Sequence, residues 1–145
     1  PAGITYDATR RSLLGAERGN HTIRRVSLEG SVTTLAGEPG VRGSSNGSGS
    51  AAHFSNPEGL AVDAGGNIIV ADSGNQTIRR ISPEGVVTTL AGSAGFTGST
   101  DAVGANARFN TPQSVAVDPA GNVFVADLLN QTVRRITPAG VVSTV

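Results

Sequence analysis

The chain has 145 residues, of which 37% are hydrophobic, and its 11 basic and 11 acidic residues give a net charge of zero. A neutral chain gives no electrostatic argument for binding nucleic acid or an anionic membrane, and no apolar run approaches the roughly 18 residues that cross a bilayer. Cysteine is absent, which excludes disulfides and thiolate chemistry. Because methionine is also absent and Pro1 comes first, we expect the sequence to have been trimmed or cut from a longer one.

Short apolar segments separated by turn residues begin at the first residues of the chain. Gly3–Asp7 and Leu13–Glu17 read as the first two strands of a unit, although the pattern there is weak. A stretch rich in Gly and Ser then follows, over residues 38–57. We therefore expect a first β unit over residues 3–37, followed by a connector.

The middle of the chain carries the clearest strand pattern. Four segments alternate with Gly-, Asn- and Pro-containing turns: Gly59–Asp63, Asn67–Asp72, Thr77–Ile81 and Val86–Ala91. The second segment is almost continuously apolar, which indicates burial on both faces. The turns are too short for anything except antiparallel hairpins. The sequence predicts a four-stranded antiparallel unit over residues 58–92.

A second connector and a third unit repeat this arrangement. The connector over residues 93–112 matches the first one, with Phe109 in the place of Phe54. Beyond it, Ser114–Asp118 and Asn122–Asp127 match the first two strands, and Val141–Val145 matches the fourth. The third predicted unit spans residues 113–145.

The pattern Thr-aliphatic-Arg-Arg occurs once in each unit, beginning at residues 22, 77 and 132, so the step is 55 residues both times. A long and constant period is typical of repeat architectures. A four-stranded antiparallel unit repeated in tandem is the blade of a β-propeller. We predict an all-β fold, a single propeller segment of three blades.

The blade motifs resemble the NHL repeat. The resemblance rests on Gly-aliphatic-Ala-Val-Asp, on Gly-Asn-aliphatic-x-Val-Ala-Asp-x-x-Asn, on aliphatic-Arg-Arg-Ile and on Val-Thr-Thr-Leu-Ala-Gly, and it covers essentially the whole chain. Proteins of that family are usually closed rings of six blades. The resemblance slightly favours an extracellular or periplasmic location.

Three blades would form half of such a ring. If each end exposes on the order of 500 Å² of apolar surface, leaving it in water forfeits about 12 kcal/mol per face, which is as much as the roughly 5–15 kcal/mol that stabilises a small domain. We therefore expect a homodimer in which two copies close a six-blade ring. The alternative is a piece of a longer propeller whose further blades are missing.

Charged residues recur in step with the strands. Glu17, Asp72 and Asp127 end the second strand of each unit, and an Arg pair follows on the third. We expect structural clamps between these carboxylates and one arginine of each pair, assigned to Arg25, Arg80 and Arg135, rather than an Arg-lined binding rim. Asp7, Asp63 and Asp118 end the first strands, where we expect them to cap backbone amides of the following turns.

The sequence offers little for catalysis. The only histidines are His21 and His53, whereas a zinc site needs three or four clustered ligands. The family resemblance includes metal-dependent lyases, which use several histidines. Asp101 and Asn46, at matching connector positions, are a weak calcium pattern. We expect no catalytic residues, no metal and no cofactor.

The function that remains is a binding or assembly module. RNA-binding NHL propellers exist, but a neutral chain with few exposed aromatic residues argues against RNA as the partner. The turns between second and third strands and the connectors should emerge on one side, and residues there that do not repeat are candidate contacts for a protein or a small ligand. They are Arg42, His53, Phe96, Asp101, Arg108, Leu128 and Leu129. The alternative function is part of a catalytic, lyase-like propeller or of a carbohydrate-binding one, completed by missing blades or a partner.

Overall fold

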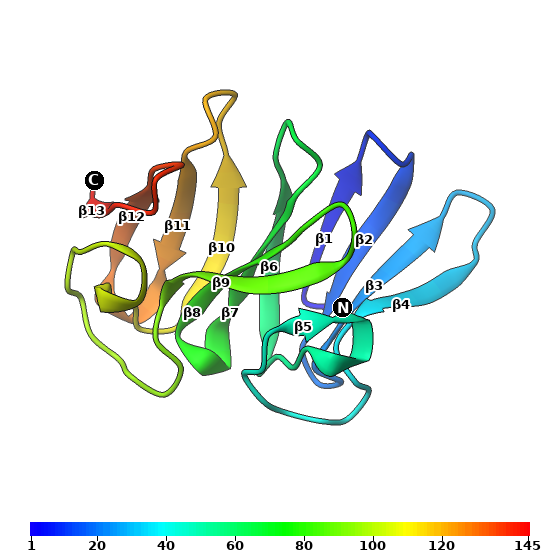
Figure 1. Ribbon diagram of the computed structural model, residues 1–145, viewed down its shortest axis with the longest axis horizontal. Coiled ribbons are helices and arrows are strands. Elements are labelled where there is room, and N and C mark those ends of the chain that lie inside the picture. The colour runs from blue at the N-terminus through cyan, green and yellow to red at the C-terminus, as the bar shows by residue number, and fades with distance from the viewer.

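The computed structural model describes all 145 residues as three antiparallel sheets arranged like a fan (Figure 1). The first sheet has the order β1-β2-β3-β4, the last has the order β10-β11-β12-β13, and the middle one has the order β5-β9-β8-β7-β6. We call the first sheet blade 1, the middle sheet blade 2 and the last sheet blade 3. Their strands are β1 Gly3–Asp7, β2 Ser12–Glu17, β3 Thr22–Ser27, β4 Val32–Ala36, β5 Gly47–Ser48, β6 Pro57–Val62, β7 Ile68–Asp72, β8 Thr77–Ile81, β9 Val86–Gly92, β10 Pro112–Val117, β11 Val123–Asp127, β12 Thr132–Ile136 and β13 Val142–Thr144.

The prediction of three four-stranded antiparallel blades is confirmed, with one addition. The connector before blade 2 contributes the short strand β5, where Gly47 pairs with Val87 and Ser48 with Val86. Four short 3₁₀ turns complete the structure: η1 Gly49–Ala51, η2 Ser73–Asn75, η3 Gly104–Asn106 and η4 Leu128–Asn130. No helix is long and apolar enough to cross a lipid bilayer.

The first strands of the blades, β1, β6 and β10, lie side by side at the narrow edge of the fan. Their backbones approach closely, and glycine makes this possible. A Cβ atom on Gly59 would lie 2.7 Å from the carbonyl oxygen of Gln113, and one on Gly3 would overlap the carbonyl oxygen of Glu58. The spacing of the inner strands therefore depends on residues without side chains.

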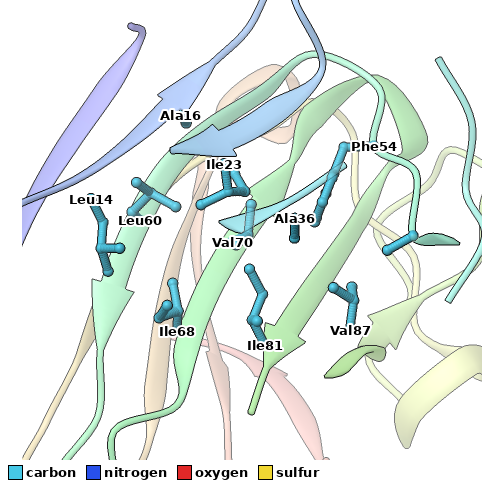
Figure 2. Packing of buried hydrophobic residues seen from close by; sticks show 11 residues of the cluster. Leu14, Ala16, Ile23, Ala36, Phe54, Leu60, Ile68, Val70, Ile81 and Val87 are labelled. Atoms are coloured by element: carbon cyan, nitrogen blue, oxygen red, sulfur yellow. The ribbon is translucent and has the colours of Figure 1, made fainter. Parts of the chain in front are cut away.

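The core consists of two layers, each between adjacent blades. Figure 2 shows the first layer, where Leu14 and Ile23 of blade 1 meet Val70 and Ile81 of blade 2, with Phe54 of the connector at its edge. The second layer joins blades 2 and 3 through the opposite face of blade 2, which carries Ile69 and Ile78, and through Phe109 of the second connector. Alternate residues of β7 thus enter different layers, which explains its continuous apolar sequence.

Blade 2 is covered on both faces, whereas blades 1 and 3 are each covered on one. We call the uncovered face of blade 1 the leading flank and that of blade 3 the trailing flank. Ile4 and Val32 are exposed on the leading flank, and Val133 and Val145 on the trailing flank. Ile4, Val32 and Val133 occupy positions that are buried in blade 2, and Val145 matches the half-buried Leu90.

The aspartates at the ends of the first strands cap the following turns, as predicted. Asp7 accepts hydrogen bonds from the amides of Thr9 and Arg10 at 3.1 and 3.2 Å. Asp63 accepts from the amide of Asn67 at 2.9 Å, and Asp118 accepts from that of Asn122 at 2.8 Å.

Candidate functional site

The connector before blade 2 is held by one buried arginine. Arg79 of β8 lies 2.9 Å from the Asp72 carboxylate, and both side chains are almost completely buried. Its Nη1 also donates to the carbonyl oxygen of His53 at 2.9 Å. Its Nη2 donates to Ser45 O and Asn46 Oδ1, both at 2.9 Å.

An aromatic ring and a backbone amide complete this arrangement. The Arg79 guanidinium lies 5.1 Å from the centroid of the Phe54 ring, within the range of a cation–π contact. Asp72 accepts the amide of Ser55, directly after Phe54, at 2.8 Å. We call the arginine and the carboxylate that bind a connector in this way the connector socket. Burial raises the pKa of Asp72 to about 6, while bonds from Asn75, the Ser55 amide and Arg79 act to lower it.

Blade 3 repeats the connector socket atom by atom. Arg134 pairs with Asp127 at 2.9 Å and donates to the carbonyl oxygen of Arg108 at 2.8 Å. The Phe109 ring lies 5.0 Å from the guanidinium, and the next amide, that of Asn110, donates to Asp127 at 2.7 Å. The socket is therefore a property of the repeat and not of one blade.

These contacts correct the predicted clamps by one residue. The sequence assignment gave the clamps to Arg25, Arg80 and Arg135, but the carboxylates pair with the preceding arginine, which is Arg24, Arg79 or Arg134. Side chains alternate along a strand, and the first arginine of each pair is the one that shares a face with the carboxylate. Of the assigned residues, Arg80 is half-buried and Arg135 exposed, and neither forms an ion pair.

Arg25 has a different partner from the predicted one. It lies 3.1 Å from Asp7, a buried carboxylate that also receives Arg10 at 3.4 Å. Burial acts to raise the pKa of Asp7, but the bonds from Arg25 and from Arg10 outweigh it and lower the pKa below its ordinary value. This cluster joins β1, β3 and the turn between β1 and β2.

Blade 1 has the residues of the socket but no connector in it. Arg24 pairs with Glu17 at 3.3 Å, and its side chain is 25% exposed, compared with 1% for Arg79 and 0% for Arg134. A cavity of about 180 Å³ lies beside it on the leading flank. The cavity is lined by Pro1, Ile4, Gly15, Glu17, Arg24, Val26 and Val32. Bonds from Thr22, Asn20 and Arg24 lower the pKa of Glu17, with Thr22 contributing most, so this socket carries a full ion pair.

The structure uses Asp101, one of the predicted rim residues, in the scaffold. Its carboxylate lies 2.7 Å from Arg134 Nη2 and also accepts from the hydroxyl and the amide of Thr144. These bonds hold Asp101 in the scaffold while its side chain remains 45% exposed, so its role in partner binding stays a prediction. Asn46 accepts a hydrogen bond from Arg79 Nη2 in the same way, at 2.9 Å.

Two other rim residues lie together on the second connector. The Arg108 guanidinium is 5.4 Å from the centroid of the Phe96 ring, which is 60% exposed. Arg108 also donates to the carbonyl oxygens of Ala105 and Ala107. Phe96 is thus exposed, whereas Arg108 is half-buried and bonded within its own connector.

The remaining rim residues lie apart from one another. The His53 ring bonds Ser45 and Glu38 at 3.3 Å within the first connector, where Arg42 is exposed. Leu128 and Leu129 form η4, with side chains 46% and 61% exposed. No cavity contains two of the seven predicted rim residues.

Sequence reasoning missed a set of residues that receive the end of each connector. His21 Nδ1 accepts the amide of Asn56 at 3.1 Å, and Gln76 Oε1 accepts that of Thr111 at 2.6 Å. Burial, followed by the charge of Arg42, lowers the pKa of His21, so its ring is neutral and free to accept. Gln131 holds the matching position in blade 3. All three have positive φ, which the sequence signals only through their constant spacing.

The chain contains no group of three His, Asp or Glu side chains arranged to hold a metal ion. His21 and His53 each bond residues of the first connector, but they do not converge on one point with carboxylates. The polar side chains of the sockets, an arginine and a carboxylate, are arranged to bind a segment of polypeptide chain.

Repeated four-stranded blades, fanned from their inner strands and joined by connectors held in this way, define a β-propeller. A family model for the NHL repeat matches residues 54–81. Human NHL repeat-containing protein 3 is 32% identical over 117 residues, covering 79% of this chain and 30% of that protein. The chain belongs to the NHL-repeat family.

Solved structures agree on the fold. A structural genomics protein of unknown function from Bacteroides thetaiotaomicron matches with a TM-score of 0.86 at 21% identity, over 91% of this chain and 34% of that one. An auxiliary nutrient binding protein from Bacteroides ovatus matches with a TM-score of 0.76 at 24% identity, over 98% of this chain and 37% of that one. The chain thus spans about a third of the length of the proteins that it resembles.

Proposed function

We propose that this chain is a non-enzymatic binding and assembly module, and that two copies close into a six-bladed ring. The observation that carries the proposal is that apolar residues of the trailing flank hold the same positions as residues that are buried in blade 2. Ile69, Ala71 and Ile78 of blade 2 are buried against blade 3. The matching residues of blade 3 are Phe124, Ala126 and Val133, of which Ala126 and Val133 are exposed and Phe124 is half-buried.

The trailing flank also carries an apolar hollow into which another surface could pack. Phe124, Ala126 and Val133 line a shallow apolar hollow of about 190 Å³, together with Ala116 and Val115. Exposed apolar patches of this kind are typical of surfaces that meet a partner. On the leading flank, Ile4 matches Leu60 and Val32 matches Val87, both of which are buried in the first core layer.

We call the contact between two adjacent blades a seam. One row of residues at the seams favours a second copy as the partner. Arg18, Ser73 and Leu128 hold the same position in the three blades, and each of the first two contacts the beginning of the next blade. Arg18 forms an ion pair with Glu58 at 3.2 Å, and the Ser73 hydroxyl donates to the carbonyl oxygen of Pro112. At a seam between copies, Leu128 would meet Pro1 and Ala2, the small apolar residues that match Pro57 and Glu58.

One residue on the seam sets a limit on how closely the copies pack. Ser114 matches Gly3 and Gly59, whose missing side chains allow the next blade to approach. Its Cβ therefore requires a wider spacing at the inner edge between the copies. The seam of the proposed ring is looser there than the two seams within the chain.

The binding role is proposed for the side of the molecule that carries the connectors. Phe96, with its exposed ring beside Arg108, and the exposed Leu129 of η4 are the groups there to which the repeat assigns no contact. Similarity to a nutrient binding protein is consistent with a ligand role for this fold, although that name describes the other protein alone.

Mass measurement by light scattering tests the proposal. A dimer of twice the 14.5 kDa chain mass is expected, and it should dissociate on dilution. A folded, soluble monomer that persists at high protein concentration would overturn the closed ring. Metal analysis tests the non-enzymatic part, because stoichiometric zinc or calcium in the purified protein would favour the lyase-like alternative instead.

A further inference from the structure

The first connector ends against a histidine, whereas the second ends against a glutamine. At the seam between blades 1 and 2, His21 Nδ1 accepts the amide of Asn56 at 3.1 Å. At the seam between blades 2 and 3, Gln76 Oε1 accepts the amide of Thr111 at 2.6 Å. The backbone is alike at both places, with φ of 60° and 62° for His21 and Gln76 and of 51° and 58° for Asn56 and Thr111. The two connector ends thus differ in the chemistry of one acceptor.

This difference makes only the first connector end dependent on pH. A backbone amide can only donate a hydrogen bond, so the ring nitrogen that it meets must carry a lone pair. In the imidazolium ion both ring nitrogens carry hydrogen, and His21 Nδ1 would face the Asn56 amide as a second donor. The carboxamide of Gln76 does not titrate and accepts at any pH.

The residue that His21 holds has a strained backbone. Asn56 has a positive φ, in a region that few residues other than glycine occupy, and such conformations persist only where the surroundings impose them. Pro57 follows it and begins β6. Glu58, the next residue, forms the ion pair with Arg18 that joins blades 1 and 2. A change at Asn56 therefore reaches this seam directly.

The surroundings of His21 oppose its protonation. Burial, followed by the charge of Arg42, lowers the pKa of the ring below its ordinary value of 6.5. The carboxylates on the elements around it are Glu17 of β2, Glu38 of the connector and Glu58 of β6, and each pairs with another residue. The stabilisation by neutral His21 is therefore present above pH 6.5 and is lost as the pH falls through the folded-state pKa.

We propose that the seam between blades 1 and 2 is a pH-sensitive joint, in which protonation of His21 releases the amide of Asn56 and with it the end of the first connector. The seam between blades 2 and 3 keeps its connector at the same pH. Both partners of the bond lie within this chain, so the joint does not depend on how the ring of blades is completed.

Hydrogen exchange of single amides tests the joint. Between about pH 7.5 and about pH 5, the protection factor of the Asn56 amide should fall about tenfold relative to that of the Thr111 amide, which is the effect of losing one hydrogen bond. The His21→Gln variant gives this seam the acceptor of the other one and should remove the fall. The Gln76→His variant should introduce a corresponding fall at Thr111.

The variants also separate His21 from two other titratable groups. Asp72 accepts the amide of Ser55, next to Asn56, and burial raises the pKa of Asp72 to about 6. The His21→Gln variant retains this carboxylate, so any fall that Asp72 causes would persist in it. The His53→Gln variant removes the other histidine of the chain and should retain the fall at Asn56.

Three results would overturn the proposal: equal changes in protection at Asn56 and Thr111 over the whole pH range, an undiminished fall in the His21→Gln variant, or loss of the fall in the His53→Gln variant. Circular dichroism at both pH values verifies that the sheets are retained in the wild type and in each variant.

Discussion

Val133→Asp tests whether the trailing flank is covered in solution. Val133 is 47% exposed, whereas the matching Ile78 is completely buried between blades. Complete burial of a valine side chain stabilises by about 1.5–3 kcal/mol, so covering the exposed half contributes about 1 kcal/mol at each seam. A ring of two copies has two seams, and the loss of about 2 kcal/mol raises the dissociation constant about 30-fold. The buried carboxylate adds a desolvation cost to this minimum.

Sedimentation velocity over a dilution series measures the effect, and thermal unfolding of the monomer provides the check on folding. The control is Val86→Asp, at a residue that is 40% exposed in blade 2, which has no free flank. The dissociation constant should rise at least 30-fold for Val133→Asp and remain near that of the wild type for Val86→Asp. Equal dissociation constants for the two variants and the wild type would refute the argument that this flank packs against a partner.

Three further predictions concern the clamps and the seam. Arg134→Leu should lower the free energy of unfolding by about 3–5 kcal/mol because it leaves the buried Asp127 carboxylate unpaired. Arg135→Ala should change the free energy of unfolding by less than about 0.5 kcal/mol. Urea unfolding of both variants measures the difference, and equal losses would contradict the corrected clamp. Arg25→Gln should cost about 1–3 kcal/mol at pH 7 by removing a charged hydrogen bond from Asp7. Because the folded-state pKa of Asp7 is lowered, this stabilisation is present above the ordinary pKa of 3.8 and is lost as the pH falls through the folded value, so the difference from the wild type should shrink below about pH 4; a difference that stays constant down to pH 2 would contradict the linkage. Leu128→Ser with Leu129→Ser should leave the thermal midpoint of the monomer unchanged and weaken dimerisation or ligand binding, and a variant unaltered in all three measurements would remove η4 from the seam.

The repeat made the fold predictable. Three copies of one pattern, 55 residues apart, specify strands, turns and blade type together, since each segment alternates between faces and ends in turn residues. The continuous apolar run of β7 also predicted correctly that both of its faces are buried. The short strand β5 could not be predicted in this way, because its two residues have no apolar pattern and pair only where the connector passes β9.

The candidate site was predictable only in part. The carboxylates at the ends of the second strands followed from their positions in the repeat, but adjacent arginines look identical in a sequence. The choice between Arg79 and Arg80 depends on the strand face that Asp72 occupies. The rim residues were expected on one side, but no local pattern indicated that Asp101 would also bind Arg134 and Thr144 within the scaffold.

The sequence by itself determined the blades, their number in this chain and their order, because hydrophobic period and turn chemistry are local properties. Only the tertiary structure decided which arginine enters each socket and which apolar faces pack against a neighbouring blade. These features depend on contacts between residues far apart in the chain, such as Arg79 with Ser45 and Arg18 with Glu58, and no local pattern encodes the presence or absence of a partner at such a contact.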